Sequence, residues 1–204
     1  MFDFLKKNRN NSKNSNKETA AVFVDFEHWC YSLDSIFSLR PDIEAFYNSI
    51  SDRFDIRRIY FFGDFTQVKL RAELDNIRKI TNNIIDTQNA QSYVTKDFTD
   101  FIMLDHIYQD IDDNPDTNAY VIFSGDGHFA SVAGYLKNKK KKKVIIYGVK
   151  KSTSNKLKSV ATECMEIPAE ADENTKYYRM ILKNFKYLDD KNRTGIPTFK
   201  TTVQ

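Results

Sequence analysis

The stretch Ala20-Ala-Val-Phe-Val-Asp25 decides the fold, because it is a continuous apolar run that ends in an acid. Apolar runs without alternation are typical of strands covered on both faces, as in a parallel sheet. The same form recurs in Ile59-Tyr-Phe-Phe-Gly-Asp64 and in Ala119-Tyr-Val-Ile-Phe-Ser-Gly-Asp126. A fourth run, Val144-Ile-Ile-Tyr-Gly148, ends in glycine before basic and hydroxyl residues. We therefore expect a parallel sheet with acids at the carboxyl ends of its strands.

Helical patterns alternate with these runs. They span residues 42–53, 68–81, 97–110 and 128–139, and residues 83–86 carry a weaker strand signal. Alternation of strand and helix indicates right-handed βαβ units. The sequence thus predicts an α/β fold with a doubly wound sheet.

Three regions are expected along the chain. Residues 1–18 are polar and basic and lack aliphatic bulk, which predicts a disordered tail,. Residues 19–167 hold the α/β pattern. Residues 168–204 begin with an acidic, loop-like stretch and are expected to form a helical extension. Its first helix, over residues 175–188, places Tyr177, Tyr178, Ile181, Leu182 and Phe185 on one apolar face,.

Composition narrows the class of protein. The 204 residues suit one domain with a small appendage,. With 31 basic and 28 acidic side chains, the net charge of +3 does not by itself imply nucleic-acid binding,. Cys30 and Cys164 lie far apart, which argues against a disulfide framework or a zinc knuckle,. The amino-terminal residues lack the apolar core of a signal peptide, and no run has the length of a membrane span, so we expect a cytoplasmic protein.

The acids at the strand ends carry the functional signal. Asp25, Asp64 and Asp126 are expected at one edge of the sheet, where ligands bind in open parallel folds,. The helix that begins near Asp97 adds Asp100 and Asp105. Clustered carboxylates raise one another's pKa unless a cation compensates, and oxygen ligands suit Mg²⁺ or Mn²⁺. Such an ion activates water and stabilises phosphoryl charge, so the pattern favours a phosphodiesterase site.

Four of these acids could also be explained by their local role in a helix or a turn. Asp97 and Asp100 are placed where a helix dipole favours negative charge. Asp64 is equally suited to a turn, and Asp126 to capping the helix that follows. The metal-site prediction depends on several strands ending alike and on no single residue.

Four segments in series resemble NYN domains, which are relatives of PIN-domain nucleases. They are Phe23-Val-Asp25-Phe-Glu-His-Trp29, the stretch from Lys96 to Asp105, Phe123-Ser-Gly-Asp126-Gly-His-Phe129, and Ile146-Tyr-Gly-Val149. The resemblance spans about residues 19–167. It implies a PIN-like three-layer α/β/α fold with a mostly parallel sheet. It also implies an endoribonuclease dependent on Mg²⁺ or Mn²⁺ that cleaves single-stranded RNA. Because PIN relatives often pair, a homodimer is left open.

The resemblance assigns roles to particular residues. Asp25, Asp100 and Asp126 become the metal ligands, and these three with Asp105 and His128 become the catalytic candidates. Candidate modulators of the site are Glu27, His28, Asp97 and Asp64.

Two positions depart from the family pattern. His28 replaces an expected Asn, and His128 replaces an expected acid. One interpretation makes the two imidazoles ligands of a softer metal or acid–base groups. The other is a catalytically degenerate domain that binds RNA or regulates without cleavage.

Positive charge is expected on both edges of the sheet. The lysine run 139–143 leads into the amino end of a strand, opposite the acids, and suits a solvated helix terminus,. Residues near the acidic edge are better candidates for RNA contacts; these are Lys96, Lys150, Lys151, Lys156 and Ser124. Residues 177–201 also resemble the start of the winged-helix-like modules that follow some NYN domains.

Overall fold

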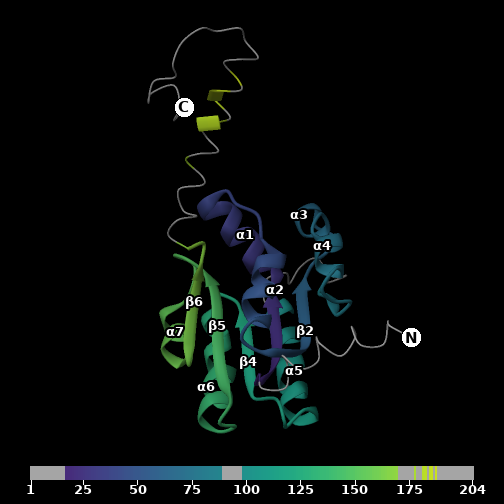
Figure 1. Cartoon of the computed structure of the whole chain (residues 1–204), viewed down its shortest axis with the longest axis vertical. Coiled ribbons are helices and arrows are strands. Elements are labelled where there is room, and N and C mark those ends of the chain that lie inside the picture. Colours follow the sequence, from purple (N-terminus) through teal and green to yellow (C-terminus); the bar gives the residue numbers. More distant parts are fainter. Residues whose placement is uncertain are drawn as a thin grey trace, which may run out of the picture.

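The computed structural model describes residues 17–88 and 98–169, together with the helical positions 177, 181, 182, 184, 185 and 187. Its strands form one six-stranded sheet in the order β3-β2-β1-β4-β5-β6, with every neighbouring pair parallel (Figure 1). The strands are β1 (Thr19–Asp25), β2 (Asp55–Gly63), β3 (Ile84–Asp86), β4 (Ala119–Phe123), β5 (Lys143–Val149) and β6 (Glu163–Ile167). The predicted α/β class and parallel sheet are confirmed, including the weak strand β3. The edge strand β6 was not predicted.

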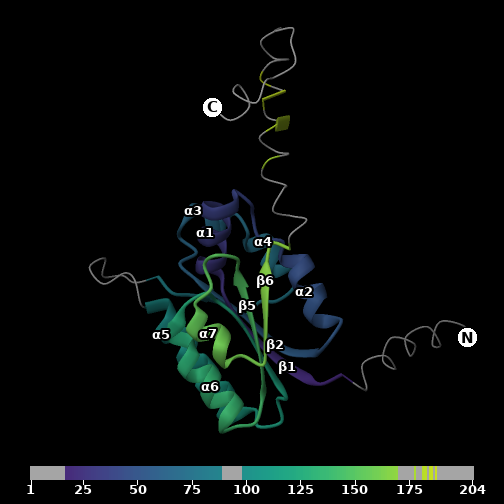
Figure 2. The same cartoon turned by 90° about the vertical axis from the view of Figure 1, so that its left-hand side faces the viewer.

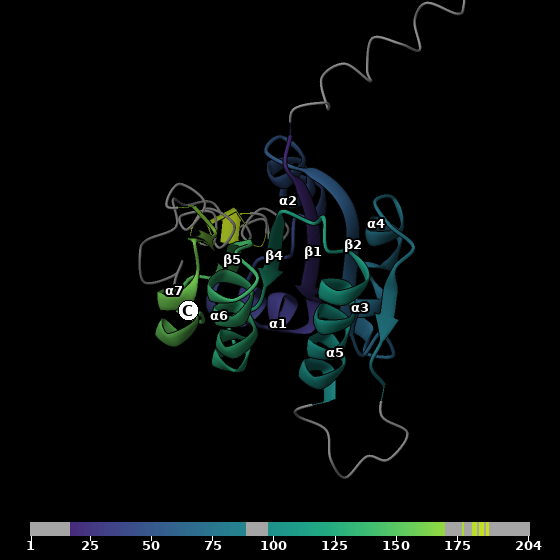
Figure 3. The same ribbon diagram turned by 90° about the horizontal axis from the view of Figure 1, so that it is seen from below.

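Helices cover both faces of the sheet and make three layers. One face carries α1 (Phe26–Phe37), α2 (Ile43–Ser51), α3 (Val68–Arg71) and α4 (Leu74–Arg78). The other carries α5 (Phe98–Asp113), the 3₁₀ turn η1 (Gly127–Phe129), α6 (Ala130–Asn138) and α7 (Asn155–Val160). Figure 2 shows the sheet between α2 and the α5–α7 side, and Figure 3 shows α5, α6 and α7 on their common face.

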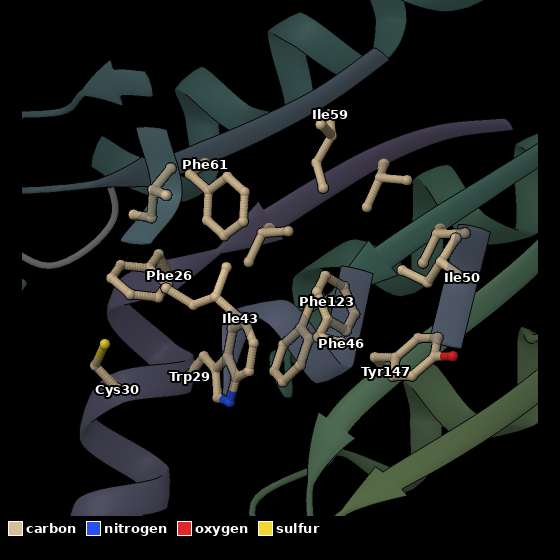
Figure 4. Close-up of a cluster of buried hydrophobic side chains, with 14 of the residues drawn as sticks. Phe26, Trp29, Cys30, Ile43, Phe46, Ile50, Ile59, Phe61, Phe123 and Tyr147 are labelled. Atoms are coloured by element: carbon tan, nitrogen blue, oxygen red, sulfur yellow. The ribbon is translucent and has the colours of Figure 1, made fainter. Parts of the chain in front are cut away.

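The alternation of side chains along β1 builds both cores. Val22 and Val24 pack with α1 and α2, in the cluster drawn in Figure 4. Ala21 and Phe23 point the other way, towards α5 and α6. Because successive strand residues face opposite sides, Asp25, two positions after Phe23, points to the same side as Phe23, which is the α5 face. The buried pattern of β1 thus fixes the direction of its terminal acid.

The strand order places a topological switch point beside that acid. From β1 the sheet grows outward through β2 and β3, and the chain then crosses to β4 on the other side of β1. Ligands of open α/β sheets bind outside the carboxyl ends of the strands at such a point. Asp25 ends one of these two strands, and Ser124 directly follows the other.

Two helical expectations differ in detail. The single helix expected over 68–81 is divided into α3 and α4 by a turn at Ala72 and Glu73. The Glu73 carboxylate is buried there and accepts a hydrogen bond from the Asn76 side chain at 2.9 Å. Helix α1 was not predicted. It begins directly after β1 because Asp25 caps it, so the apolar run and the helix share one residue.

The lysine run 139–143 lies at the amino edge of the sheet, as its position in the sequence predicts. Lys143 begins β5, and its Nζ atom lies 2.5 Å from a carboxylate oxygen of Glu18. Lys140 pairs with Asp112 at 3.6 Å. Acids at this edge therefore engage part of the run, far from the switch point. Among the described helices, none is long and apolar enough to cross a membrane.

The expected tail over 1–18 and the extension over 168–204 fall almost wholly outside the described residues. Of the tail, the structure describes Lys17 and Glu18. Of the extension, it describes residues 168 and 169 and the six helical positions named above.

A buried ion pair joins β2 to α5. The Arg58 guanidinium donates to both carboxylate oxygens of Asp110, and its Nη2 also donates to Thr117 Oγ1 at 2.6 Å. Only 4% of the Asp110 side chain is exposed. Arg58→Met leaves this carboxylate buried without its partner, and we expect a loss of about 3–5 kcal/mol of unfolding free energy in urea.

The double variant Arg58→Met with Asp110→Leu removes both charges, and we expect it to recover most of that loss. Equal destabilisation of the single and double variants contradicts this interpretation, since the loss then comes from packing.

Candidate functional site

Asp25 is a buried carboxylate at the switch point. Its Oδ1 atom accepts the His28 backbone N–H at 2.9 Å and so caps α1, and its Oδ2 atom accepts the Ser124 hydroxyl at 3.0 Å. The residue is 5% exposed. Burial raises the pKa of this carboxyl to about 7; the charge of Asp100 adds to the rise, while the hydrogen bond from His28 opposes it,.

Ser124 couples the end of β4 to the end of β1. It accepts the Asp126 backbone N–H at 3.1 Å while donating to Asp25. The residue is fully buried. The structure therefore places Ser124 where it orients Asp25 and the turn after β4, and not on the outer surface.

Three further side chains form what we call the acid–imidazole cluster: Asp100, Asp126 and His128. One ligand atom from each lies within 4.8 Å of the others. His128 Nδ1 is 3.1 Å from Asp126 Oδ1 and 3.6 Å from Asp100 Oδ2. Asp126 Oδ1 also accepts the His128 backbone N–H at 2.8 Å. Asp126 thus caps η1, as its local explanation anticipates, and also contributes to the cluster.

The register of α5 decides which of its acids reaches the site. Met103, Ile107 and Ile111 are buried against the sheet, and Asp100 lies one turn earlier on the same side,. Asp105 is exposed and accepts a hydrogen bond from the Gln109 side chain at 2.7 Å. Of the two helix carboxylates named from the sequence, the structure brings Asp100 into the cluster and does not bring Asp105.

The donor set suits a divalent cation. Carboxylate oxygens are ligands for Mg²⁺ and Mn²⁺, and an imidazole nitrogen shifts the preference towards transition metals. Asp25 lies outside the group of mutually close ligand atoms, although its pKa responds to the charge of Asp100. Three acids of like charge gathered at one sheet edge are what a bound cation would neutralise.

His28 is not in the cluster. Its Nε2 atom lies 3.1 Å from Ser152 Oγ and 3.4 Å from Ser32 Oγ. A Cβ atom on Gly125 would come within 2.3 Å of that nitrogen, so the chain needs glycine there. Burial lowers the pKa of His28, against the opposing charge of Asp126. The imidazole therefore joins α1 to the loop after β5 beneath the Ser-Gly-Asp turn.

Asp64 and Glu27 form a separate polar group at the end of β2. Asp64 accepts hydrogen bonds from the Thr66 backbone at 3.0 Å and from the Gln67 side chain at 3.2 Å. Burial raises the pKa of Asp64, but the hydrogen bonds from Thr66 and Gln67 outweigh it and the pKa is lowered. Burial and the charge of Asp64 raise the pKa of Glu27, against a hydrogen bond from the Asp64 backbone. Asp64 is therefore positioned as a turn acid.

The structure places some of the candidate lysines at the acidic edge of the sheet and directs another away from it. Lys150 follows β5 at the acidic edge, and Lys156 is exposed in the first turn of α7. Lys151 has φ 69° and directs its ammonium over the Phe37 ring at 5.7 Å, towards the last turn of α1. Lys96 and Asp97 lie outside the described residues.

Two aromatic residues near the site were missed from the sequence. Phe98 and Phe101 begin α5 beside Asp100 and are 47% and 66% exposed. Their place on the outer side of α5 follows from the same register that turns Asp105 outward.

The parallel sheet and the acids at its switch point define an α/β domain with a candidate metal site at the carboxyl edge of the sheet,. Comparison with known proteins identifies the family. The profile of the NYN domain family matches residues 19–168, and the chain belongs to this family. No curated protein matches the chain. A crystal structure of a protein of unknown function from Vibrio parahaemolyticus superposes with a TM-score of 0.66 at 21% identity, covering 76% of this chain and 95% of that one. This likeness supports the fold.

The raised pKa of Asp25 predicts a pH-dependent stability. The folded pKa of about 7 exceeds the ordinary value of 3.8, so the carboxyl favours folding below pH 3.8 and loses that contribution as pH rises through 7,. The shift corresponds to about 4 kcal/mol at most. Without divalent metal, we expect Asp25→Asn to gain unfolding free energy relative to wild type as pH rises from about 4 to about 8. Urea unfolding across this range measures the difference. A constant difference contradicts the assignment.

Proposed function

We propose that this protein is a metal-dependent ribonuclease that hydrolyses RNA phosphodiester bonds with Mg²⁺ or Mn²⁺. The observation that carries the proposal is the convergence of Asp100, Asp126 and His128 within 4.8 Å of one another, beside the buried Asp25. Membership of the NYN family supports a nuclease-like domain. Single-stranded RNA as substrate and a cytoplasmic location belong to the proposal.

The residues have separate tasks in this proposal. Asp100, Asp126 and His128 hold the ion, and Asp25 adds negative charge behind them. When bound, a divalent ion supplies a water of lowered pKa and positive charge for phosphoryl oxygens. Ser124 keeps Asp25 aligned through its 3.0 Å hydrogen bond. His28 supports the turn after β4 through its contacts with Ser32 and Ser152.

The surroundings of the cluster suit a single strand. Lys150 and Lys156 lie on the same edge as the acids and supply positive charge for phosphates,. Phe98 and Phe101 present exposed rings on which bases can stack,. We propose that the strand runs over the carboxyl edge of the sheet from the start of α5 towards α7.

A second function has one specific observation in its favour. The imidazole of His128 stands 3.1 Å from the Asp126 carboxylate and 3.6 Å from the Asp100 carboxylate, so the ring itself can engage the acids that an ion would otherwise bridge. A domain of this kind binds RNA without cleaving it. Salt-sensitive RNA binding without turnover in either metal distinguishes this function from nuclease activity.

Substitutions in the cluster test cleavage. We expect labelled single-stranded RNA to be cleaved with Mn²⁺ or Mg²⁺, and Asp126→Asn and Asp100→Asn to abolish cleavage because they remove charged ligands. Calorimetry should show weaker Mn²⁺ binding by the same variants.

Asp105→Asn is the matched control, because it removes a carboxylate from the same helix on its exposed side. We expect it to keep both cleavage and Mn²⁺ binding. Cleavage that survives Asp126→Asn shows a contaminating enzyme. Loss of cleavage in Asp105→Asn with Mn²⁺ binding intact would place Asp105 in the reaction instead.

Charge reversal tests the RNA surface. Lys150→Glu with Lys156→Glu should weaken RNA binding and reduce the slope of log K against log salt by about 1.4, at about 0.7 for each phosphate contact of a single strand. The control is Lys139→Glu with Lys141→Glu, which changes the charge equally at the amino edge. We expect the control to bind RNA like wild type. If both double variants lose RNA affinity equally, the effect is one of general charge, and the assignment of Lys150 and Lys156 to the RNA surface is wrong.

A further inference from the structure

A groove lies on the face of the sheet away from the acid–imidazole cluster. Its volume is about 500 Å³, and its lining is mostly apolar. Trp29 and Leu33 of α1, Phe46 of α2 and Tyr147 of β5 form its inner wall, and the last residues of β6 form its outer wall. Figure 4 shows Trp29, Phe46 and Tyr147 side by side in this part of the core.

The groove exists because the two faces of the sheet are covered unequally. On the α5 face, α6 and α7 pack over β5 and the edge of the sheet. On the other face, α1 and α2 cover the central strands, and Met165 of β6 remains 39% exposed. Trp29 Nε1, at the groove, is buried without a hydrogen-bond partner among the described residues. Apolar strand positions at this edge thus lack the covering helix that the rest of the sheet has.

The chain leaves the described domain at the rim of this groove. Residues 167–169, Ile167-Pro168-Ala169, line it directly, and residue 170 continues from there. The apolar face predicted over residues 175–188 follows within a few residues. Its described members Tyr177, Ile181, Leu182 and Phe185 are helical and between 38% and 66% exposed. An uncovered apolar groove and an uncovered apolar helix face are therefore joined by a short connection.

We propose that the groove is the docking site of the chain's own segment 175–188. A helix of this length extends about 21 Å, at about 1.5 Å per residue. The five connecting residues span up to about 17 Å, enough for the segment to turn back along β6. Burial of the apolar face would stabilise both partners, and the short connection gives the segment a high local concentration at the groove.

The groove lies away from the acid–imidazole cluster, so docking of the segment does not cover the cluster. The acids and Lys156 belong to the α5 face and the carboxyl edge, whereas the groove belongs to the α1 and α2 face. The docked segment completes the domain and leaves the acid–imidazole cluster open. Loss of docking should therefore lower stability and leave Mn²⁺ binding unchanged, which separates this inference from the proposed function.

Disulfide trapping in the full chain tests the docking directly. In a Cys164→Ser background, Met165→Cys is combined with Leu182→Cys, or with Lys183→Cys as the control, which the helical period of the sequence predicts on the polar side of the segment. We expect an intramolecular crosslink for the Leu182→Cys pair and much less for the control. Crosslinks between two chains show that the groove joins copies of the protein and overturn the proposal. Equal crosslinking of both pairs, or none, also overturns it.

A stability comparison without new cysteines provides the second measurement. Leu182→Gln with Phe185→Gln makes the apolar face polar, and Lys176→Gln with Lys183→Gln changes the opposite face. We expect the first pair alone to lower the urea midpoint of unfolding, with Mn²⁺ binding kept by both. Equal midpoints for the two pairs overturn the proposal.

Discussion

The burial of β1 on both faces, between two parallel neighbours, is the constraint on which the rest of the structure depends. Its residues alternate between the two cores, and its pairing with β2 on one side and β4 on the other makes it the centre of the switch in strand order. The strand ends at a polar residue whose carboxylate is satisfied by its surroundings. Asp25 is that residue, held by the amide of His28 and the hydroxyl of Ser124.

The electrostatics of the site follow from this position. A carboxyl buried at a strand end loses hydration, which raises the pKa of Asp25, and the nearby charge of Asp100 raises it further,. Asp126 and His128 are more exposed and lie outside it, where an ion and a phosphate could reach them. The two histidines at the departing positions have different surroundings. His128 belongs to the acid–imidazole cluster, and His28 contacts Ser152 and supports the turn after β4.

The two faces of the sheet carry different features. The α5 face directs Asp25, Asp100 and Asp126 to one edge, because β1, β4 and α5 all end or begin there. The α1 and α2 face carries the larger aromatic core and the groove beside β6. The acid–imidazole cluster and the apolar groove can therefore coexist in one small domain, since the sheet separates them.

The sequence by itself determined β1, β2, β4 and β5, more weakly β3, and the edge on which Asp25 and Asp126 lie, because continuous apolar runs are a local property of the chain,. It also placed the lysine run at the opposite edge. Only the tertiary structure decided that Asp100 and not Asp105 faces the site, since the register of α5 depends on what it packs against. The Ser124 link to Asp25, the buried role of His28 and the uncovered side of β6 arise from contacts distant in sequence, which no local pattern encodes.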